Sequence, residues 1–325
     1  MAEGRPAGDV PALLAAARRG EPRAVARLIS LVENASPRLR EIMAELAPHA
    51  GRARVIGLTG SPGVGKSTCT SALVAAYRRA GLRVGVLAVD PSSPFSGGAL
   101  LGDRVRMNEH ALDPGVYVRS MATRGQLGGL AWAAPQAVRV LDAAGCDVIL
   151  IETVGVGQSE VDIAAQADTT VVLLAPGMGD GVQAAKAGIL EVGDVFVVNK
   201  ADRDGAGTTV RELQHMLGLG APRAPGDWRP AILRTVAARG EGVDELVAAL
   251  EKHAAWQHEH GAIVERRRRR AAREIETIAL TALRARMDAI RGDHHLAALA
   301  ARVQSGELDP YGAADLLVEE LSTPE

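Results

Sequence analysis

The sequence predicts an α/β fold in which a doubly wound, mostly parallel sheet is flanked by N-terminal and C-terminal helical extensions. Apolar runs alternate with amphipathic stretches through the middle of the chain, which is typical of strands that alternate with helices. A glycine-rich segment follows the first of these runs directly and precedes helix-forming residues. The expected strands are residues 55–59, 83–89, 116–118, 148–151, 170–174, 195–198 and 231–233.

The periodicity divides the chain into three regions. Residues 1–50 are helical in pattern, because Pro11 and Pro22 suit first-turn positions before apolar residues at helical spacing, so we expect an N-terminal helical arm. Residues 51–258 hold the strands and are the size of one doubly wound domain. Residues 259–325 lack strands but carry apolar residues along a long charged helix, which must bury them against something. A second copy of the chain is the expected partner. The helices expected between strands are residues 128–143, 181–191, 208–217 and 242–250.

Composition excludes several classes of protein. The net charge of −2 provides no field that would recruit nucleic acid or an acidic membrane. The two cysteines, Cys69 and Cys146, form no disulfide framework and suit a reducing compartment. No leader and no apolar run near the ~20 residues that cross a bilayer is visible. We therefore expect a cytoplasmic protein with neither nucleic acid nor membrane as partner.

The glycine-rich segment matches the phosphate-binding pattern G-x-x-x-x-G-K-[ST]. Glycines let backbone N–H groups turn towards a phosphate, and the following helix N-terminus adds partial positive charge. Lys66 is expected to reach the β- and γ-phosphates, and the Ser67 hydroxyl to bind Mg²⁺. The alternative is a glycine-rich turn without a ligand, but the flanking strand and helix favour a nucleoside triphosphate. The segment consists of Gly60, Ser61, Pro62, Gly63, Val64, Gly65, Lys66, Ser67 and Thr68.

A second motif indicates which base is bound. Asn199, Lys200 and Asp202 follow an apolar strand in the form N-K-x-D. An aspartate carboxylate accepts hydrogen bonds from guanine N1–H and N2–H₂, which adenine lacks. The asparagine side chain can bond the base or tie this loop to the phosphate loop, and the lysine stem can cover the base. A weaker signal is the segment Thr235, Val236 and Ala237, placed to offer backbone N–H groups to guanine O6.

Acidic residues at strand ends suit metal binding and hydrolysis. Glu152 ends an apolar strand and begins E-x-x-G, and Asp90 ends another strand. Together with Ser67 and Asp103 they could supply the oxygen ligands that Mg²⁺ prefers. We expect Lys66, Glu152 and Asp90 to serve catalysis, whereas Asp103 is equally compatible with a helix cap. Whether Gln158 reaches the attacking water stays open.

These motifs together resemble the MeaB/ArgK family, whose members are P-loop GTPases that accompany adenosylcobalamin-dependent methylmalonyl-CoA mutase. The resemblance covers essentially the whole chain. It implies GTP and GDP with Mg²⁺ as ligands, a homodimer formed largely through C-terminal helices, and a chaperone that gates cofactor delivery and protects or reactivates the mutase. It also implies a coupling role for Lys186, for which a solvated helix position is the alternative. The runs that carry it are residues 60–68, 89–94, 98–107, 152–160, 176–180 and 199–202.

Three other interpretations compete with this one. A nickel metallochaperone would need clustered soft or imidazole ligands, but the cysteines stand apart and the histidines at 253, 258 and 260 are expected on a helix surface. A transport-associated kinase would prefer ATP, against the N-K-x-D motif. Nucleic-acid binding through the arginine run 266–270 is disfavoured because the run wraps round a helix. We expect these arginines to be solvated or to pair with a dimer mate. Methylmalonyl-CoA and isobutyryl-CoA mutase are both open as the enzyme served.

Overall fold

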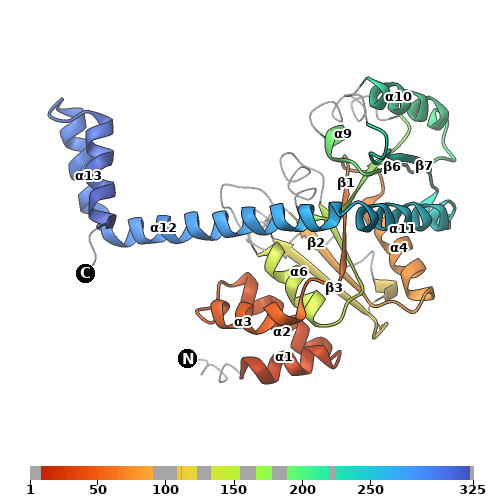
Figure 1. Ribbon diagram of the computed structural model, residues 1–325, viewed down its shortest axis with the longest axis horizontal. Coiled ribbons are helices and arrows are strands. Elements are labelled where there is room, and N and C mark those ends of the chain that lie inside the picture. The colour runs from red at the N-terminus through yellow and green to blue at the C-terminus, as the bar shows by residue number, and fades with distance from the viewer. Residues whose placement is uncertain are drawn as a thin grey trace. The chain divides into compact units, whose positions relative to one another are not determined.

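The computed structural model describes residues 9–90, 108–110, 112–122, 133–153, 166–177, 189–219 and 224–322. The chain divides into two compact units, Met1–Arg266 and Arg267–Glu325. The first unit contains the whole sheet and the helices packed on it, and the second contains the C-terminal helices (Figure 1). The helices expected for residues 1–50 therefore belong to the same compact unit as the sheet.

A seven-stranded sheet in the order β3-β2-β4-β1-β5-β6-β7 forms the centre of the first unit. All neighbouring strands are parallel. Each of the seven expected strands is present, which confirms the predicted fold class. In such sheets, the ligand site lies at the carboxyl ends of the strands where the chain turns to opposite sides. The strands are β1 Arg54–Thr59, β2 Val84–Asp90, β3 Val116–Ala122, β4 Val148–Thr153, β5 Thr169–Leu174, β6 Val195–Val198 and β7 Ala231–Arg234.

Helices cover both faces of the sheet. On one face, α4 and α11 pack on alternate strand residues such as Val86, Leu150 and Val171. On the other face, α6 packs on Leu87 and Ile149, and α10 covers the β5–β6 end. Both faces are thus buried, which explains why the strand sequences are continuous apolar runs rather than alternating ones. The bounds are α4 Lys66–Arg79, α6 Ala134–Ala143, α9 Ile189–Val192, α10 Ala206–Gly218 and α11 Val243–Glu259.

The N-terminal helices form a further layer outside α6 (Figure 1). One face of α2 buries Val25, Leu28 and Val32 in a core that it shares with α1, α3 and α6. The Asp142 carboxylate of α6 accepts hydrogen bonds from the N–H groups of Arg52 (3.2 Å) and Ala53 (3.0 Å), which fixes the link into β1. The bounds are α1 Val10–Arg18, α2 Pro22–Glu33 and α3 Leu39–Leu46.

The second unit consists of most of α12 (Ala262–Gln304) together with α13 (Pro310–Ser322). Leu299, Ala313 and Leu317 form a small core between these helices. The predicted long charged helix is confirmed, and its apolar residues Ile275 and Leu283 are 68% and 50% exposed. Among the described helices, none combines the length and apolar character that a bilayer crossing requires.

Candidate active site

The phosphate loop connects β1 to α4, because Thr59 ends the strand and Lys66 begins the helix. Gly60 and Gly65 have φ values of +138° and +96°, in the left-handed region that favours glycine. A Cβ atom on Gly60 would lie 2.2 Å from the carbonyl oxygen of Leu173, and one on Gly65 would lie 2.4 Å from Asn199 Nδ2. Both glycines are therefore required by backbone conformation and by close neighbours.

Lys66 lies inside the loop that it terminates. Its side chain is buried, and Nζ donates to the carbonyl oxygens of Gly60 (2.5 Å) and Ser61 (3.1 Å). These bonds keep the ammonium within the loop whose sequence predicts phosphate binding. A compact ammonium group with three N–H donors is well suited to this position.

Glu152 lies at the carboxyl end of β4, next to β1 in the sheet. Its carboxylate is buried at 3% exposure and accepts hydrogen bonds from two hydroxyls of α4. Ser67 Oγ lies 2.8 Å from Oε1, and Thr70 Oγ1 lies 2.5 Å from Oε2. The structure thus brings two of the expected metal ligands, Ser67 and Glu152, into direct contact. Thr70 was not expected, and the only signal for it is its place three residues after Ser67, on the same side of the helix.

Asn199 connects the two predicted nucleotide-binding segments. Its Nδ2 donates to the carbonyl oxygen of Val64 in the phosphate loop (2.9 Å). Its Oδ1 accepts from Thr235 Oγ1 (3.0 Å) and from the N–H of Ala237 (3.1 Å). Of the two roles that the sequence left open, the structure therefore shows the one that ties the loops together. With 2% of its surface exposed, this side chain is part of the framework of the site.

Lys200 and Asp202 lie at the rim of the same site. Lys200 has a φ of +56°, unusual for a residue with a side chain, and its Nζ donates to the carbonyl oxygen of Gly63 (2.6 Å). Asp202 is exposed and forms an ion pair with Arg239 (3.2 Å). The lysine stem thus spans from the guanine-reading motif to the phosphate loop, and the aspartate carboxylate is accessible at the surface.

The segment Thr235–Ala237 uses its own N–H groups within the protein. The N–H of Thr235 donates to Val198, that of Val236 to Glu241, and that of Ala237 to Asn199. The expected donation of these N–H groups to a guanine oxygen stays a prediction, and it requires one of these bonds to be shared or exchanged. What the structure adds is that Thr235 and Ala237 orient Asn199.

Several predicted residues are not placed in the site by this structure. Asp90 ends β2, but only its backbone is described. Asp103, Gln158 and Lys186 lie outside the described residues. Their roles as metal ligand, water-orienting residue and coupling residue stay predictions.

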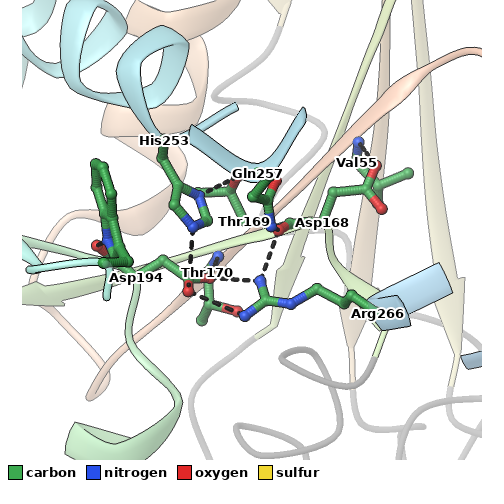
Figure 2. A network of polar contacts seen from close by, with 9 residues as sticks. Val55, Asp168, Thr169, Thr170, Asp194, His253, Gln257 and Arg266 are labelled. Carbon is green, nitrogen blue, oxygen red and sulfur yellow. Dashed lines mark hydrogen bonds and ion pairs between the residues drawn. The ribbon is translucent and has the colours of Figure 1, made fainter. Parts of the chain in front are cut away.

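A second polar network lies where β5 and β6 begin, at the strand ends opposite to those that carry the phosphate loop (Figure 2). Arg266 donates from Nη1 to Asp194 Oδ2 (2.7 Å) and to the carbonyl oxygen of Asp168 (2.6 Å), and from Nη2 to Asp194 Oδ1 (3.0 Å). The N–H of Thr170 also donates to Asp194 (2.8 Å). The expectation that this arginine is solvated or pairs with a dimer mate was wrong, because it pairs within its own chain.

His253 belongs to the same network (Figure 2) and is only 1% exposed. Its Nδ1 lies 2.8 Å from Thr169 Oγ1, and its Nε2 lies 3.5 Å from Asp194 Oδ1. Burial lowers the pKa of His253; the Asp194 carboxylate opposes this shift and the Arg266 guanidinium adds to it. The expectation of a solvated surface histidine was therefore wrong for this position, which faces the sheet.

The cysteines do not favour a soft-metal site. Cys69 and Cys146 are both buried, and burial raises the pKa of each thiol to about 12. Neither thiol is therefore poised to supply the thiolate that a soft metal would require near neutral pH. Within the described part of the chain, no group of three or more histidine, cysteine or acidic residues is arranged to hold a metal ion.

The parallel sheet, the phosphate loop after its first strand and the guanine-reading segment joined to it define a P-loop GTPase. The chain belongs to the family described as methylmalonyl Co-A mutase-associated GTPase MeaB, whose model matches residues 25–291.

Known proteins similar to this chain agree with this family. A Pyrococcus abyssi protein named as a GTPase is 48% identical over 305 residues, 94% of each chain. GTPase ArgK of Escherichia coli is 39% identical over 240 residues, 72% of each chain. The mouse protein named methylmalonic aciduria type A homolog, mitochondrial, is 38% identical over 244 residues, 70% of this chain and 59% of the mouse protein. A solved structure titled LAO/AO transport system kinase superposes with a TM-score of 0.72 at 25% identity, covering 97% of this chain and 98% of that one.

Proposed function

We propose that this GTPase is a chaperone for an adenosylcobalamin-dependent acyl-CoA mutase, with methylmalonyl-CoA mutase as the first candidate. In this role, GTP hydrolysis gates cofactor delivery and protects or reactivates the mutase. The observation that carries the proposal is the match to the mutase-associated GTPase family over residues 25–291, which includes the phosphate loop, Glu152 and the segment 199–202.

The chemistry proposed for the site follows from its donors and charges. Asp202 reads guanine, and the loop N–H groups with Lys66 bind the phosphates and stabilise the charge that develops on the γ-phosphate oxygens. Ser67, Glu152, Asp90 and Asp103 are proposed as magnesium ligands, directly or through water. The contact of a hydroxyl with a carboxylate at Ser67 and Glu152 fits the oxygen preference of this ion. When bound, Mg²⁺ would neutralise charge on the β- and γ-phosphate oxygens.

The proposed assembly is a homodimer that uses the C-terminal helices. Support comes from α12, on which Ile275, Ile278, Leu280 and Leu283 are each about half exposed or more. Apolar side chains on successive turns of a helix are commonly buried against a partner. Light scattering coupled to size-exclusion chromatography measures this directly, and a monomeric mass at micromolar concentration would remove the homodimer from the proposal.

The decisive experiment measures GTP turnover with and without purified candidate mutases. We expect at least a severalfold stimulation and a complex that depends on the bound nucleotide. A variant with Lys66→Ala should show no stimulated turnover, because Lys66 is proposed to bind the phosphates, so this control assigns the stimulated hydrolysis to the phosphate loop. If GTP turnover is not stimulated and no complex forms with any cobalamin-dependent mutase, the chaperone role is overturned. The GTPase assignment would remain intact in that case. The kinase title of the solved relative makes ATP consumption a useful second readout, because a preference for ATP would favour the transport-kinase interpretation.

A further inference from the structure

Thr70 lies in the first turns of α4, one turn beyond Lys66 and outside the phosphate-binding motif. Its side chain is fully buried, and Oγ1 has two acceptors within reach. The carboxylate oxygen Oε2 of Glu152 lies at 2.5 Å, and the carbonyl oxygen of Lys66 lies at 3.1 Å. A threonine hydroxyl has a single proton to donate. The negative charge of the carboxylate favours donation to Glu152, because charge-assisted hydrogen bonds are stronger than neutral ones.

The two oxygens of Glu152 have separate partners on the same helix. Oε1 accepts from Ser67 and Oε2 accepts from Thr70. Ser67 is the motif hydroxyl proposed to bind Mg²⁺, so its oxygen must serve the metal and the carboxylate together. Thr70 is not among the proposed metal ligands. It can therefore hold Oε2 whatever happens at Ser67.

The need for such an anchor follows from the residue that ends β4. A glutamate has one more rotatable bond than the aspartate found in the related D-x-x-G motif, and its terminal torsion has a broad energy profile. Removing the donor from Oε2 takes away one of the hydrogen bonds that orient the buried carboxylate of Glu152, so Oε1 is held less firmly against Ser67. Catalytic and metal-binding groups depend on neighbours of this kind for their orientation.

We infer that Thr70 is a positioning residue that orients Glu152 for the magnesium-bound nucleotide. The inference rests on the magnesium ligands proposed above and is independent of the mutase. It predicts that removing the Thr70 hydroxyl weakens the linkage between Mg²⁺ and nucleotide, while binding of the nucleotide alone is unchanged. A threonine that merely bonds to its own helix would affect neither quantity.

The test measures GDP affinity by calorimetry in EDTA and in Mg²⁺, and takes the ratio as the magnesium linkage. Thr70→Val removes the donor at nearly constant shape, and Thr70→Ser keeps it. We expect Thr70→Val to bind GDP in EDTA within about twofold of the wild type and to lose about tenfold of the linkage, the effect of one hydrogen bond to a charged group. Thr70→Ser should retain the linkage within about threefold.

A double-mutant cycle shows whether the effect passes through the carboxylate. In a Glu152→Gln background, Thr70→Val should cause little further loss of linkage, because its target is already altered. Unchanged linkage in Thr70→Val, or an equal loss of GDP affinity in EDTA, would overturn the inference. If Thr70→Val does not fold, as judged by circular dichroism, Thr70→Ser and its double-mutant cycle with Glu152→Gln take its place as the test. A full loss of magnesium linkage in Thr70→Ser then contradicts the inference. A wild type without any magnesium linkage would overturn the metal assignment and this inference with it.

Discussion

Replacing Arg266 by methionine tests the polar network that joins the start of α12 to the sheet. Methionine keeps much of the aliphatic stem but removes the guanidinium, so three hydrogen bonds to Asp194 and Asp168 are lost. The Asp194 carboxylate, with 10% of its side chain exposed, would keep the N–H of Thr170 as a donor but lose its cation.

The expected loss of stability lies between two known limits. Removing one partner of a buried ion pair costs about 3–5 kcal/mol, and exposed pairs contribute about 0–1 kcal/mol. The Arg266 side chain is 34% exposed, so we expect about 2–3 kcal/mol. Burial alone lowers the pKa of Arg266, but the hydrogen bond and the charges of Asp194 and Asp168 more than offset it, so the pKa lies above its ordinary value. The surroundings of Arg266 therefore favour its charged form overall.

Urea unfolding followed by tryptophan fluorescence and circular dichroism measures the change. Trp228 and Trp256 lie beside His253 in this network and report on it locally. The matched control is Arg268→Met, which changes an exposed arginine of the same run and should stay within about 0.5 kcal/mol of the wild type. Equal stability of the two variants would refute the argument. A cycle with Asp194→Asn should show strong non-additivity, since the two residues act as one pair.

The remaining predictions concern pH, the phosphate loop and the base. Because the pKa of His253 is lower in the folded protein than the ordinary value near 6.5, stability is complete above about pH 6.5 and falls as pH drops towards the folded pKa. His253→Gln should flatten this slope in urea titrations from pH 7.5 to 5.5, and identical slopes would contradict the assignment. Gly65→Ala should abolish detectable GDP binding in calorimetry, because its Cβ meets Asn199; Gly81→Ala, with φ of +79° and no neighbour within 4 Å, is the control that should bind normally. Asp202→Asn should weaken GDP binding about a hundredfold and admit xanthosine diphosphate, whose O2 accepts a hydrogen bond from the new amide NH₂ group. Unchanged GDP affinity would exclude Asp202 as the residue that reads the base.

Much of the fold was predictable because its signals are local. Each expected strand is an apolar run, most of them buried on both faces of a parallel sheet, and all seven were confirmed. The phosphate loop was equally clear, since its glycines are required where they stand by positive φ angles. The class of protein and the guanine preference both followed from such short, consecutive patterns.

Other features were missed or misread because they depend on residues distant in the sequence. Thr70 has no signature of its own, and its partner Glu152 lies 82 positions away. Arg266 was read as solvated because a run of arginines looks the same whether or not one of them meets Asp194, 72 residues earlier. His253 directly follows the charged residues Glu251 and Lys252 in sequence, and its position over β5 buries it.

By itself, the sequence determined the order of strands and helices, the phosphate loop, the base-reading motif and the family. These depend on the conformational preferences and hydrogen-bonding groups of neighbouring residues, which can be read along the chain. The tertiary structure alone decided that Asn199 joins the phosphate loop to the guanine-reading segment and that Thr70 and Ser67 each donate to one oxygen of Glu152. It also decided that Arg266 completes a polar network where β5 and β6 begin. The physical reason is that the placement of β1 between β4 and β5 brings these distant groups within hydrogen-bonding distance, where burial makes each pairing necessary.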